Sequence, residues 1–413
     1  MRSWKRTYGL LCLLFAGVLV GACGGGGGGG VVGAPAPPAG ALDVFVSPDV
    51  AMRFASLDNA QETTGSDSTG IGGGFIAVNT VTGQVSGFLV HNIADAQSAH
   101  IHVGARGIAG GIVIELTPDN TATTTVYTVP DNTFLPNPVT DVPAFLAGNL
   151  YFNVHNAAFP GGVIRGQLDM EPTTIRFASL DNTQETTGSN SAGIGGGIIG
   201  IDEVTGQVMG FAVHNVADGN RAHIHPGARG IAGGIAVPML PDNVVSPVFV
   251  VPDGAVMNLV TDVPGFLAGN TYINIHNAAF PGGVIRGQLD MEPTVMRFAS
   301  LDNAQETTGS DSTGKGGGVV GVNEATGRVA GFAVHNVADG NRAHIHPGAR
   351  GIAGGIAVPM LPDPLVSPVF AVPDGALMNL VTDVPAFLAG TMYINVHSAA
   401  FPGGVIRGQL DQN

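Results

Sequence analysis

All twelve histidines of the chain fall into three sets with the same spacing. In each set, two histidines flank a single residue and a third lies nine residues before them. A fourth follows the pair after 53, 51 and 51 residues in the three sets. Because imidazole is a common ligand of zinc and copper, the pattern predicts one four-histidine metal site per set, with copper or zinc as the ion. The sets are His91, His100, His102 and His155; His214, His223, His225 and His276; and His335, His344, His346 and His397.

The alternative is a network of buried, hydrogen-bonded histidines that stabilises the fold without a metal. The first set tests the two interpretations, because its surroundings differ from those of the nearly identical second and third sets. Val103 stands where the second set has Pro226, and Gln97-Ser98 stands where it has Asn220-Arg221, yet all four histidines are kept. This favours the metal site.

The elements that must position these histidines are predicted to be strands. In Ala222-His223-Ile224-His225, a period of two places both histidines on one face and Ile224 on the core side. Tyr272, Asn274 and His276 alternate in the same way with two isoleucines, so His276 ends a polar stripe. Short strands with frequent glycine turns indicate antiparallel sheets. Strand pairing is therefore expected to gather the imidazoles of each set.

Three copies of one unit carry the three sets. The phrase beginning Arg53-Phe54 returns at Arg176 and Arg297, and each copy closes on Val-Ile-Arg-Gly-Gln-Leu. A period near 120 residues is long enough for an independent core. The chain is therefore predicted to be all-β, with three tandem antiparallel β-sandwich domains of Greek-key-like topology at residues 48–171, 172–292 and 293–413, after a signal peptide and a flexible linker.

The N-terminus predicts export and a lipid anchor. Three basic residues precede an apolar run, Leu10–Val20, which is too short to span a membrane and fits a signal peptide over residues 1–22. Val20-Gly21-Ala22-Cys23 resembles a bacterial lipobox, in which the cysteine is lipidated, so Cys23 is the expected anchor point. Residues 23–47 are rich in Gly, Pro and Ala and are predicted to be a flexible tether. Glycine after Cys23 favours the outer membrane or the cell surface.

Charge and cysteine content narrow the partners further. Without residues 1–22 the chain has 13 basic and 31 acidic residues, 13 − 31 = −18, which argues against nucleic acid. The only cysteines are Cys12, in the predicted signal, and Cys23, so no disulfide is expected and any metal ligands are nitrogen or oxygen atoms. The expected partner is the membrane, through the anchor, while a macromolecular partner and an oligomeric state are not specified.

Other repeated polar residues have structural explanations. Arg165, Arg286 and Arg407 are expected to form inter-strand ion pairs with Glu62, Glu185 and Glu306. Arg106, Arg229 and Arg350, in Gly-Ala-Arg-Gly turns, are expected to be solvated. The glycine runs such as Gly195–Gly197 lack the lysine and helix of a phosphate loop, and no hydrolytic triad or carboxylate pair is present, so the chain is not expected to be an enzyme.

The order of motifs resembles a known family. Leu-Asp-x-x-Gln-Glu, Ala-His-Ile-His-x-Gly, Tyr-x-Asn-x-His and Pro-Gly-Gly-Val-Ile-Arg-Gly-Gln-Leu follow one another in every copy, as in the CHRD domain named after chordin. The resemblance covers about residues 50–413 and implies a β-sandwich. A weaker similarity is to copper–zinc superoxide dismutase, through the paired and distant histidines. The missing cysteine pair and histidine-rich loop argue against a dismutase site.

Two functions follow as expectations. The first is an exported, lipid-anchored protein that binds up to one copper or zinc ion per domain. The second is a structural or adhesive surface array in which the histidines are only hydrogen-bonded. A less favoured third function is catalysis at a copper centre similar to that of superoxide dismutase.

Overall fold

The computed structural model describes residues 49–118 and 125–411. The predicted signal peptide, Cys23 and the tether lie outside these residues. All described residues belong to one compact unit, so the domains within it can be compared directly. Among them, no helix is long and apolar enough to cross a membrane.

Each domain is a sandwich of two antiparallel sheets, and the second domain shows the plan. Its inner sheet has the order β10-β11-β12-β15 and its outer sheet the order β14-β13-β16-β17. The single helix α2 (Asp262–Leu267) precedes β16. The strands are β10 (Thr174–Leu180), β11 (Gly195–Ile201), β12 (Val208–His214), β13 (Arg221–Pro226), β14 (Val237–Met239), β15 (Val248–Val250), β16 (Thr271–His276) and β17 (Ile285–Gln288).

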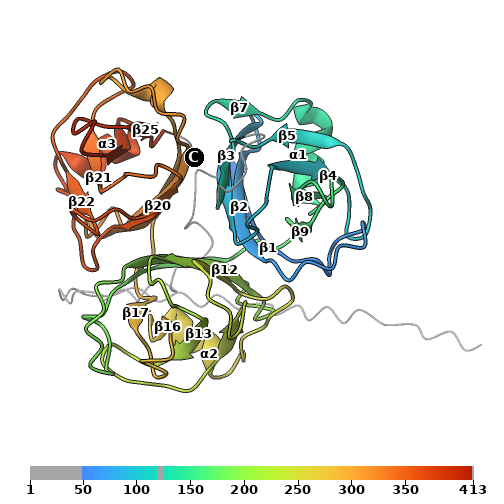
Figure 1. The fold of residues 1–413 in the computed structure, drawn as a ribbon, viewed down its shortest axis with the longest axis horizontal. Helices are drawn as coiled ribbons and strands as arrows, with labels where there is room; N and C mark the ends of the chain where they lie inside the picture. The colour runs from blue at the N-terminus through green and yellow to red at the C-terminus, as the bar shows by residue number, and fades with distance from the viewer. Residues whose placement is uncertain (1–48, 119–124, 412–413) are drawn as a thin grey trace, which may run out of the picture. The chain divides into compact units, whose positions relative to one another are not determined.

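The first and third domains repeat this plan (Figure 1). In the first domain, β7 adds a short fifth strand to the inner sheet by pairing with β3. Its elements are β1 (Val50–Leu57), β2 (Gly72–Asn79), β3 (Gln84–His91), β4 (Ser98–Val103), β5 (Ile112–Glu115), β6 (Val126–Thr128), β7 (Thr133–Phe134), α1 (Pro138–Leu146), β8 (Leu150–His155) and β9 (Ile164–Gln167). The third domain has β18 (Val295–Leu301), η1 (Asn303–Gln305), β19 (Gly316–Val322), β20 (Val329–His335), β21 (Arg342–Pro347), β22 (Val358–Met360), β23 (Val369–Ala371), α3 (Asp383–Leu388), β24 (Met392–His397) and β25 (Ile406–Gln409).

A separate core fills each sandwich, as the alternation predicted. In the second domain, Ile224, Ile273 and Ile275 point inward from the outer sheet and meet inner-sheet residues such as Phe249. An antiparallel bridge between Asp181 and Arg286 joins the edges of the two sheets. The predicted fold class, three tandem antiparallel β-sandwich domains, is confirmed.

A fourth core lies between the domains and is built from the other face of the three inner sheets. Phe88, Phe211 and Phe332, one from each domain, form a triangle with ring centroids 6.0–6.1 Å apart and edge-to-face packing. The glycine runs explain this close approach. A Cβ atom on Gly196 would lie 2.5 Å from Cβ of Phe332, and Gly73 and Gly317 meet Phe211 and Phe88 in the same way. These glycines therefore serve domain packing.

Arginine–aspartate pairs connect the domains in a closed cycle. Arg106 contacts Asp253 of the second domain, Arg229 contacts Asp374 of the third, and Arg350 contacts Asp131 of the first. Each arginine also pairs with an aspartate of its own domain, as Arg229 does with Asp290. The turn arginines are exposed to solvent, as expected, but the turns lie at the domain interfaces, and the ion pairs that the arginines form there were not expected.

Candidate metal centre

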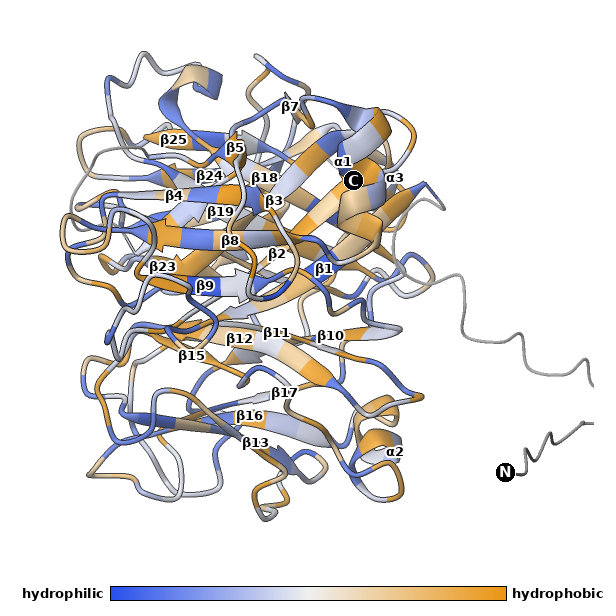
Figure 2. Cartoon of the chain, turned by 90° about the vertical axis from the view of Figure 1, so that its right-hand side faces the viewer, coloured by the Kyte–Doolittle hydropathy of each residue, from blue (hydrophilic) through white to orange (hydrophobic). Residues whose placement is uncertain are grey.

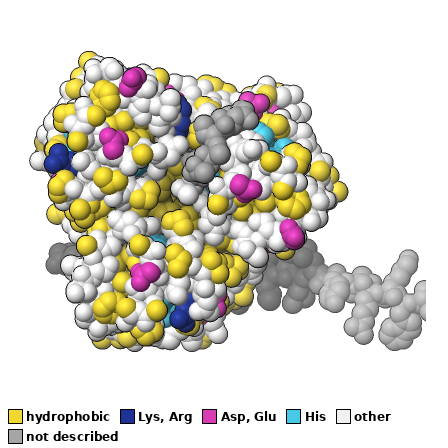
Figure 3. Space-filling model, viewed as in Figure 1, with side chains coloured by type: hydrophobic (Ala, Val, Ile, Leu, Met, Phe, Trp, Pro, Cys, Tyr) yellow, Lys and Arg dark blue, Asp and Glu magenta, His cyan; other side chains and the backbone are white. Residues whose placement is uncertain are grey.

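Three of the four histidines of each set come together on the outer sheet. Their candidate ligand atoms lie within 4.8 Å of one another in every domain. We call each group a triad: His100, His102 and His155; His223, His225 and His276; and His344, His346 and His397. Figure 3 shows that histidine side chains reach the surface at only a few points of the face it displays.

Strand register brings each triad together. In the second domain β13 pairs with β16, with His225 opposite Tyr272, His223 opposite Asn274 and Arg221 opposite His276. Because side chains alternate, His223 and His225 share the face that His276 also occupies. This register places the His-x-His pair and the later histidine on one face of the sheet, as the sequence predicted.

Backbone carbonyls determine which nitrogen of two triad histidines carries a proton. Nδ1 of His225 lies 2.8 Å from the carbonyl oxygen of Gly234, and Nδ1 of His276 lies 3.1 Å from that of Pro281. A carbonyl can only accept, so both Nδ1 atoms donate, and both Nε2 atoms keep a lone pair. Nε2 of His276 accepts from Nδ1 of His223 at 3.0 Å. Nε2 of His225 is buried and has no hydrogen-bond partner.

The other two domains repeat this arrangement. Nδ1 of His102 donates to Gly110 and that of His346 to Gly355, while His155 and His397 donate to Pro160 and Pro402. In both domains Nε2 of the second histidine, His102 or His346, is again buried without a partner. Such carbonyl contacts are the usual way in which a protein fixes the tautomer of a metal-binding histidine.

A tyrosine and an arginine hold the second triad histidine from behind. The ring of His225 stacks on Tyr272 with centroids 5.1 Å apart and planes 10° apart. The guanidinium of Arg286 also lies over the ring of Tyr272, with its Cζ 3.5 Å from the ring centroid. The hydroxyl of Tyr272 accepts a hydrogen bond from the amide of Gly233, next to the carbonyl that orients His225. The position of the His225 ring and its tautomer are therefore set by one connected group of residues, Tyr272, Arg286 and the loop at Gly233.

Arg286 makes no ion pair with Glu185, so the inter-strand ion pair is not formed in the described residues. Arg286 donates instead to the carbonyls of Ile231 and Ala228 and to Gln288, and its counterparts Arg165 and Arg407 do the same. Burial raises the pKa of Glu185 to about 7, although the more distant arginine charge opposes this shift. The arginine is thus part of the support of the triad.

Electrostatics keep the triads in the neutral, ligating form. Burial lowers the pKa of His155 to about 4, that of His276 to about 3 and that of His397 to about 4, and the neighbouring imidazoles lower them further. Burial also lowers the pKa of His102, His225 and His346. Because a metal binds only the unprotonated imidazole, these shifts favour coordination at neutral pH.

Two aspartates beside the triads were missed in the sequence. Burial lowers the pKa of His223 and His344, and the carboxylates of Asp242 and Asp363 oppose the shifts. Asp363 also accepts from Nε of Arg342 at 2.8 Å. A Pro-Asp pair recurs at these positions and at Pro118-Asp119, so the repeat itself carried the signal, although Asp119 lies outside the described residues.

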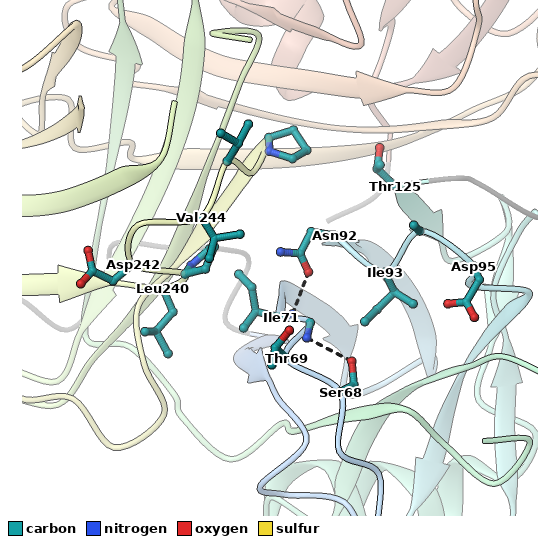
Figure 4. A pocket seen from close by; sticks show the side chains of 15 residues that line it. Ser68, Thr69, Ile71, Asn92, Ile93, Asp95, Thr125, Leu240, Asp242 and Val244 are labelled. Atoms are coloured by element: carbon teal, nitrogen blue, oxygen red, sulfur yellow. Dashed lines mark hydrogen bonds between the residues drawn. The ribbon is translucent and has the colours of Figure 1, made fainter. Parts of the chain in front are cut away.

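A cavity of about 780 Å³ between the first two domains is separate from the triads (Figure 4). Asn92, Ile93 and Leu240 are among its lining residues, and no histidine is. Two of its lining aspartates connect it with the surroundings of a triad. Asp242 opposes the pKa shift of His223, and Asp95 accepts from the side-chain amide of Asn156, next to His155.

The fourth histidine of each set lies elsewhere. His91, His214 and His335 end the inner-sheet strands β3, β12 and β20 and are fully buried. Each stacks on an aromatic ring of the inner sheet, Tyr127, Phe249 or Phe370, at 5.3–5.4 Å. The predicted four-histidine site is therefore brought together in the structure only as a triad.

The comparisons with known proteins agree with this architecture. The CHRD domain matches residues 53–168, 176–289 and 297–410, most of the chain, and the chain belongs to this family. The three matched segments are the three sandwiches. No curated protein and no solved structure matches the chain.

Proposed function

We propose that this is an exported, lipid-anchored protein of the cell envelope that binds one copper or zinc ion in each domain. The observation that carries the metal proposal is the fixed tautomer of the triads. In two histidines of each triad a backbone carbonyl accepts from Nδ1, so that Nε2 keeps its lone pair. Nε2 of His102, His225 and His346 is buried without a partner. Leaving such an atom unpaired costs free energy, which a metal ion would recover.

Metal binding would use three nitrogens and leave a coordination position open. Three histidines suit either copper or zinc, and a bound ion would replace the hydrogen bond between the first and last histidines of the triad. That bond, at 2.9–3.0 Å in all three domains, is the observation that favours the second candidate function, a purely structural histidine network.

Ion counting separates the two candidates. Residues 48–413, purified without a tag, are titrated with copper(II) and zinc(II), and bound ions are counted after dialysis. We expect three equivalents, two for His225→Ala, and none for the triple variant H102A/H225A/H346A. Circular dichroism confirms that each variant is folded. Fewer than one ion per chain in the folded wild-type domains would overturn metal binding and support the structural network.

Lipid anchoring is supported by the sequence around Cys23 and is tested in cells. The full chain is expressed in a Gram-negative bacterium with labelled palmitate. Incorporation of the label and recovery with outer membranes are expected for the wild type and not for Cys23→Ser. An unlabelled wild-type protein in the soluble fraction would contradict the anchor.

A further inference from the structure

One end of the described unit carries the three α-helices α1, α2 and α3, and we call it the helix end. In the second domain the hairpin turn between β11 and β12 lies here, because Ile201 pairs with Val208. The helix α2 leads directly into β16, whose first residue Thr271 pairs with the last residue of β13. Figure 2 shows α1, α2 and α3 at the same end of the unit. The three sandwiches therefore point in one direction.

Large apolar side chains are exposed at this end in every domain. Val139, Val260 and Val381, just before or within the first turn of each helix, are 83%, 82% and 83% exposed. The remaining exposed apolar side chains of the hairpin turns and helix loops are Val81, Phe134, Leu146, Val204, Val256, Leu259, Leu377, Leu380 and Leu388. Their recurrence at the same end of every domain makes this end a candidate interaction surface.

The backbone holds these side chains outward. Oδ1 of Asn258 accepts from the amides of Val260 and Thr261, and the amide of Asn258 donates to Asp262. The third domain makes the same bonds around Asn379. Leu259 in turn packs against the hairpin turn, where a Cβ on Gly206 would lie 3.1 Å from its Cδ2. These loops are therefore ordered, and their valines cannot fold back into the core.

The chain also enters the unit at the helix end. The carbonyl of Asp49 accepts from the amide of Thr80, in the hairpin turn after β2, and Val50 pairs with Asn79. The 25 residues from Cys23 to residue 47 directly precede this point. Even fully extended they would span only about 85 Å. An anchor at Cys23 would keep the helix end within this distance of the lipid.

We propose that the helix end lies on the lipid surface, with its valines and leucines inserted among the headgroups. This inference rests on the lipid anchor of the proposed function, and the tether is the reason to choose lipid over a protein partner. Tethering raises the effective concentration of the domains at the membrane, so weak insertion suffices to orient them. Asp141, Asp262 and Asp383 lie in the first turns of the helices, so a zwitterionic surface is preferred over an anionic one.

Such an orientation has a consequence for the triads. His155, His276 and His397 are the last residues of β8, β16 and β24, which begin at the helix end. In the second domain, His276 would therefore lie at the end of the sandwich that faces away from the membrane, while His225, opposite Tyr272, would lie nearer to the lipid.

A single tryptophan reports the orientation. Trp4 is the only tryptophan and lies in the predicted signal, so residues 23–413 have none, and Cys23 is their only cysteine. These residues, with Val260→Trp, are coupled through Cys23 to a maleimide lipid in phosphatidylcholine vesicles containing brominated acyl chains. The matched control is Val366→Trp, at a side chain that is 65% exposed. Val366 lies far from the helix end, because the amide of the next residue, Ser367, donates to the carbonyl of Gly340 at the opposite end of the sandwich.

We expect blue-shifted emission and at least twofold quenching by brominated lipid for Val260→Trp, and neither for Val366→Trp. Adding Val139→Asp and Val381→Asp should abolish the quenching. Equal emission and equal quenching at both positions would overturn the inference. That result is expected if the domains tumble freely on the tether, and also if the helix end binds a protein partner in cells and not lipid. Because the coupling is chemical, a failure of natural lipidation appears only in the palmitate experiment and leaves this result readable.

Discussion

The inner and outer sheets of each domain hold histidine in opposite chemical states. On the inner sheet, Nδ1 of His214 accepts from the amide of Val216 at 3.1 Å, so the proton of the neutral ring is on Nε2. On the outer sheet, Nδ1 of His225 donates to a carbonyl, so Nε2 keeps a lone pair. Both rings stack on an aromatic side chain of a neighbouring strand. The backbone group that faces Nδ1, rather than the residue type, separates a structural imidazole from a potential ligand.

The largest expected effect is on stability at acidic pH, to which the inner histidines and the last histidine of each triad, with a similarly lowered pKa, both contribute. Burial lowers the pKa of His91 to about 3 and that of His214 and His335 to about 4. Since the unfolded value is near 6.5, the unfolded chain binds protons first as the pH falls below 6.5. The stability contributed by the neutral rings is full above pH 6.5 and is lost toward pH 4. Each inner histidine should cost about 2 kcal/mol between pH 6.5 and 4.5.

Urea unfolding of the metal-free domains at a series of pH values measures the loss. Carbon–proton NMR of labelled histidine follows each ring separately, and the three inner rings should stay neutral down to about pH 4.5. An inner histidine that titrates near pH 6.5 in the folded protein would contradict the assigned burial effect.

The sequence predicted the histidine positions on the outer sheet better than those on the inner sheet. The three sandwiches, the shared face of His223 and His225 and the later arrival of His276 follow from strand alternation. The position of His214 does not, because its nine-residue distance from His223 fits a return within one sheet as well as a change of sheet. The glycine runs were equally ambiguous, since their purpose depends on Phe332 of another domain. Contacts between repeats of equal sequence leave no local signal.

Replacing one histidine from each sheet should separate fold from metal. His214→Ala removes a fully buried ring that stacks on Phe249 and should cost about 3 kcal/mol, while the number of bound ions stays at three. His214→Asn, whose Oδ1 can accept from Val216 in place of Nδ1, should recover part of this loss. His225→Ala also loses packing, but it alone should lower the ion count to two. Unfolding curves and ion counts on the same samples decide, and a lost ion in folded His214→Asn would contradict the separation.

The loop that orients His225 should be less sensitive but still measurable. A Cβ on Gly233 would lie 1.6 Å from the carbonyl oxygen of Pro226, so Gly233→Ala must displace the loop. We expect a loss of about 2 kcal/mol and weaker binding of one of the three ions, because the acceptor of Nδ1 moves. Gly234→Ala is the matched control, since a Cβ there meets no atom within 4 Å. Similar calorimetric titrations for both variants would show that the loop does not orient the ring.

The smallest effect should come from removing one tyrosine hydroxyl. Removing it on the outer sheet or on the inner sheet tests whether only the outer sheet binds metal. Tyr272→Phe keeps the ring under His225 and Arg286 but removes the acceptor of the Gly233 amide. We expect about 1 kcal/mol of lost stability and roughly tenfold weaker metal binding in that domain. Tyr127→Phe is the inner-sheet counterpart: Tyr127 stacks on His91, and the other domains carry Phe249 and Phe370 at this position. It should leave the three ion affinities unchanged, because no ligand nitrogen depends on that ring. A change of affinity in Tyr127→Phe, with none in Tyr272→Phe, would place the metal on the inner sheet instead.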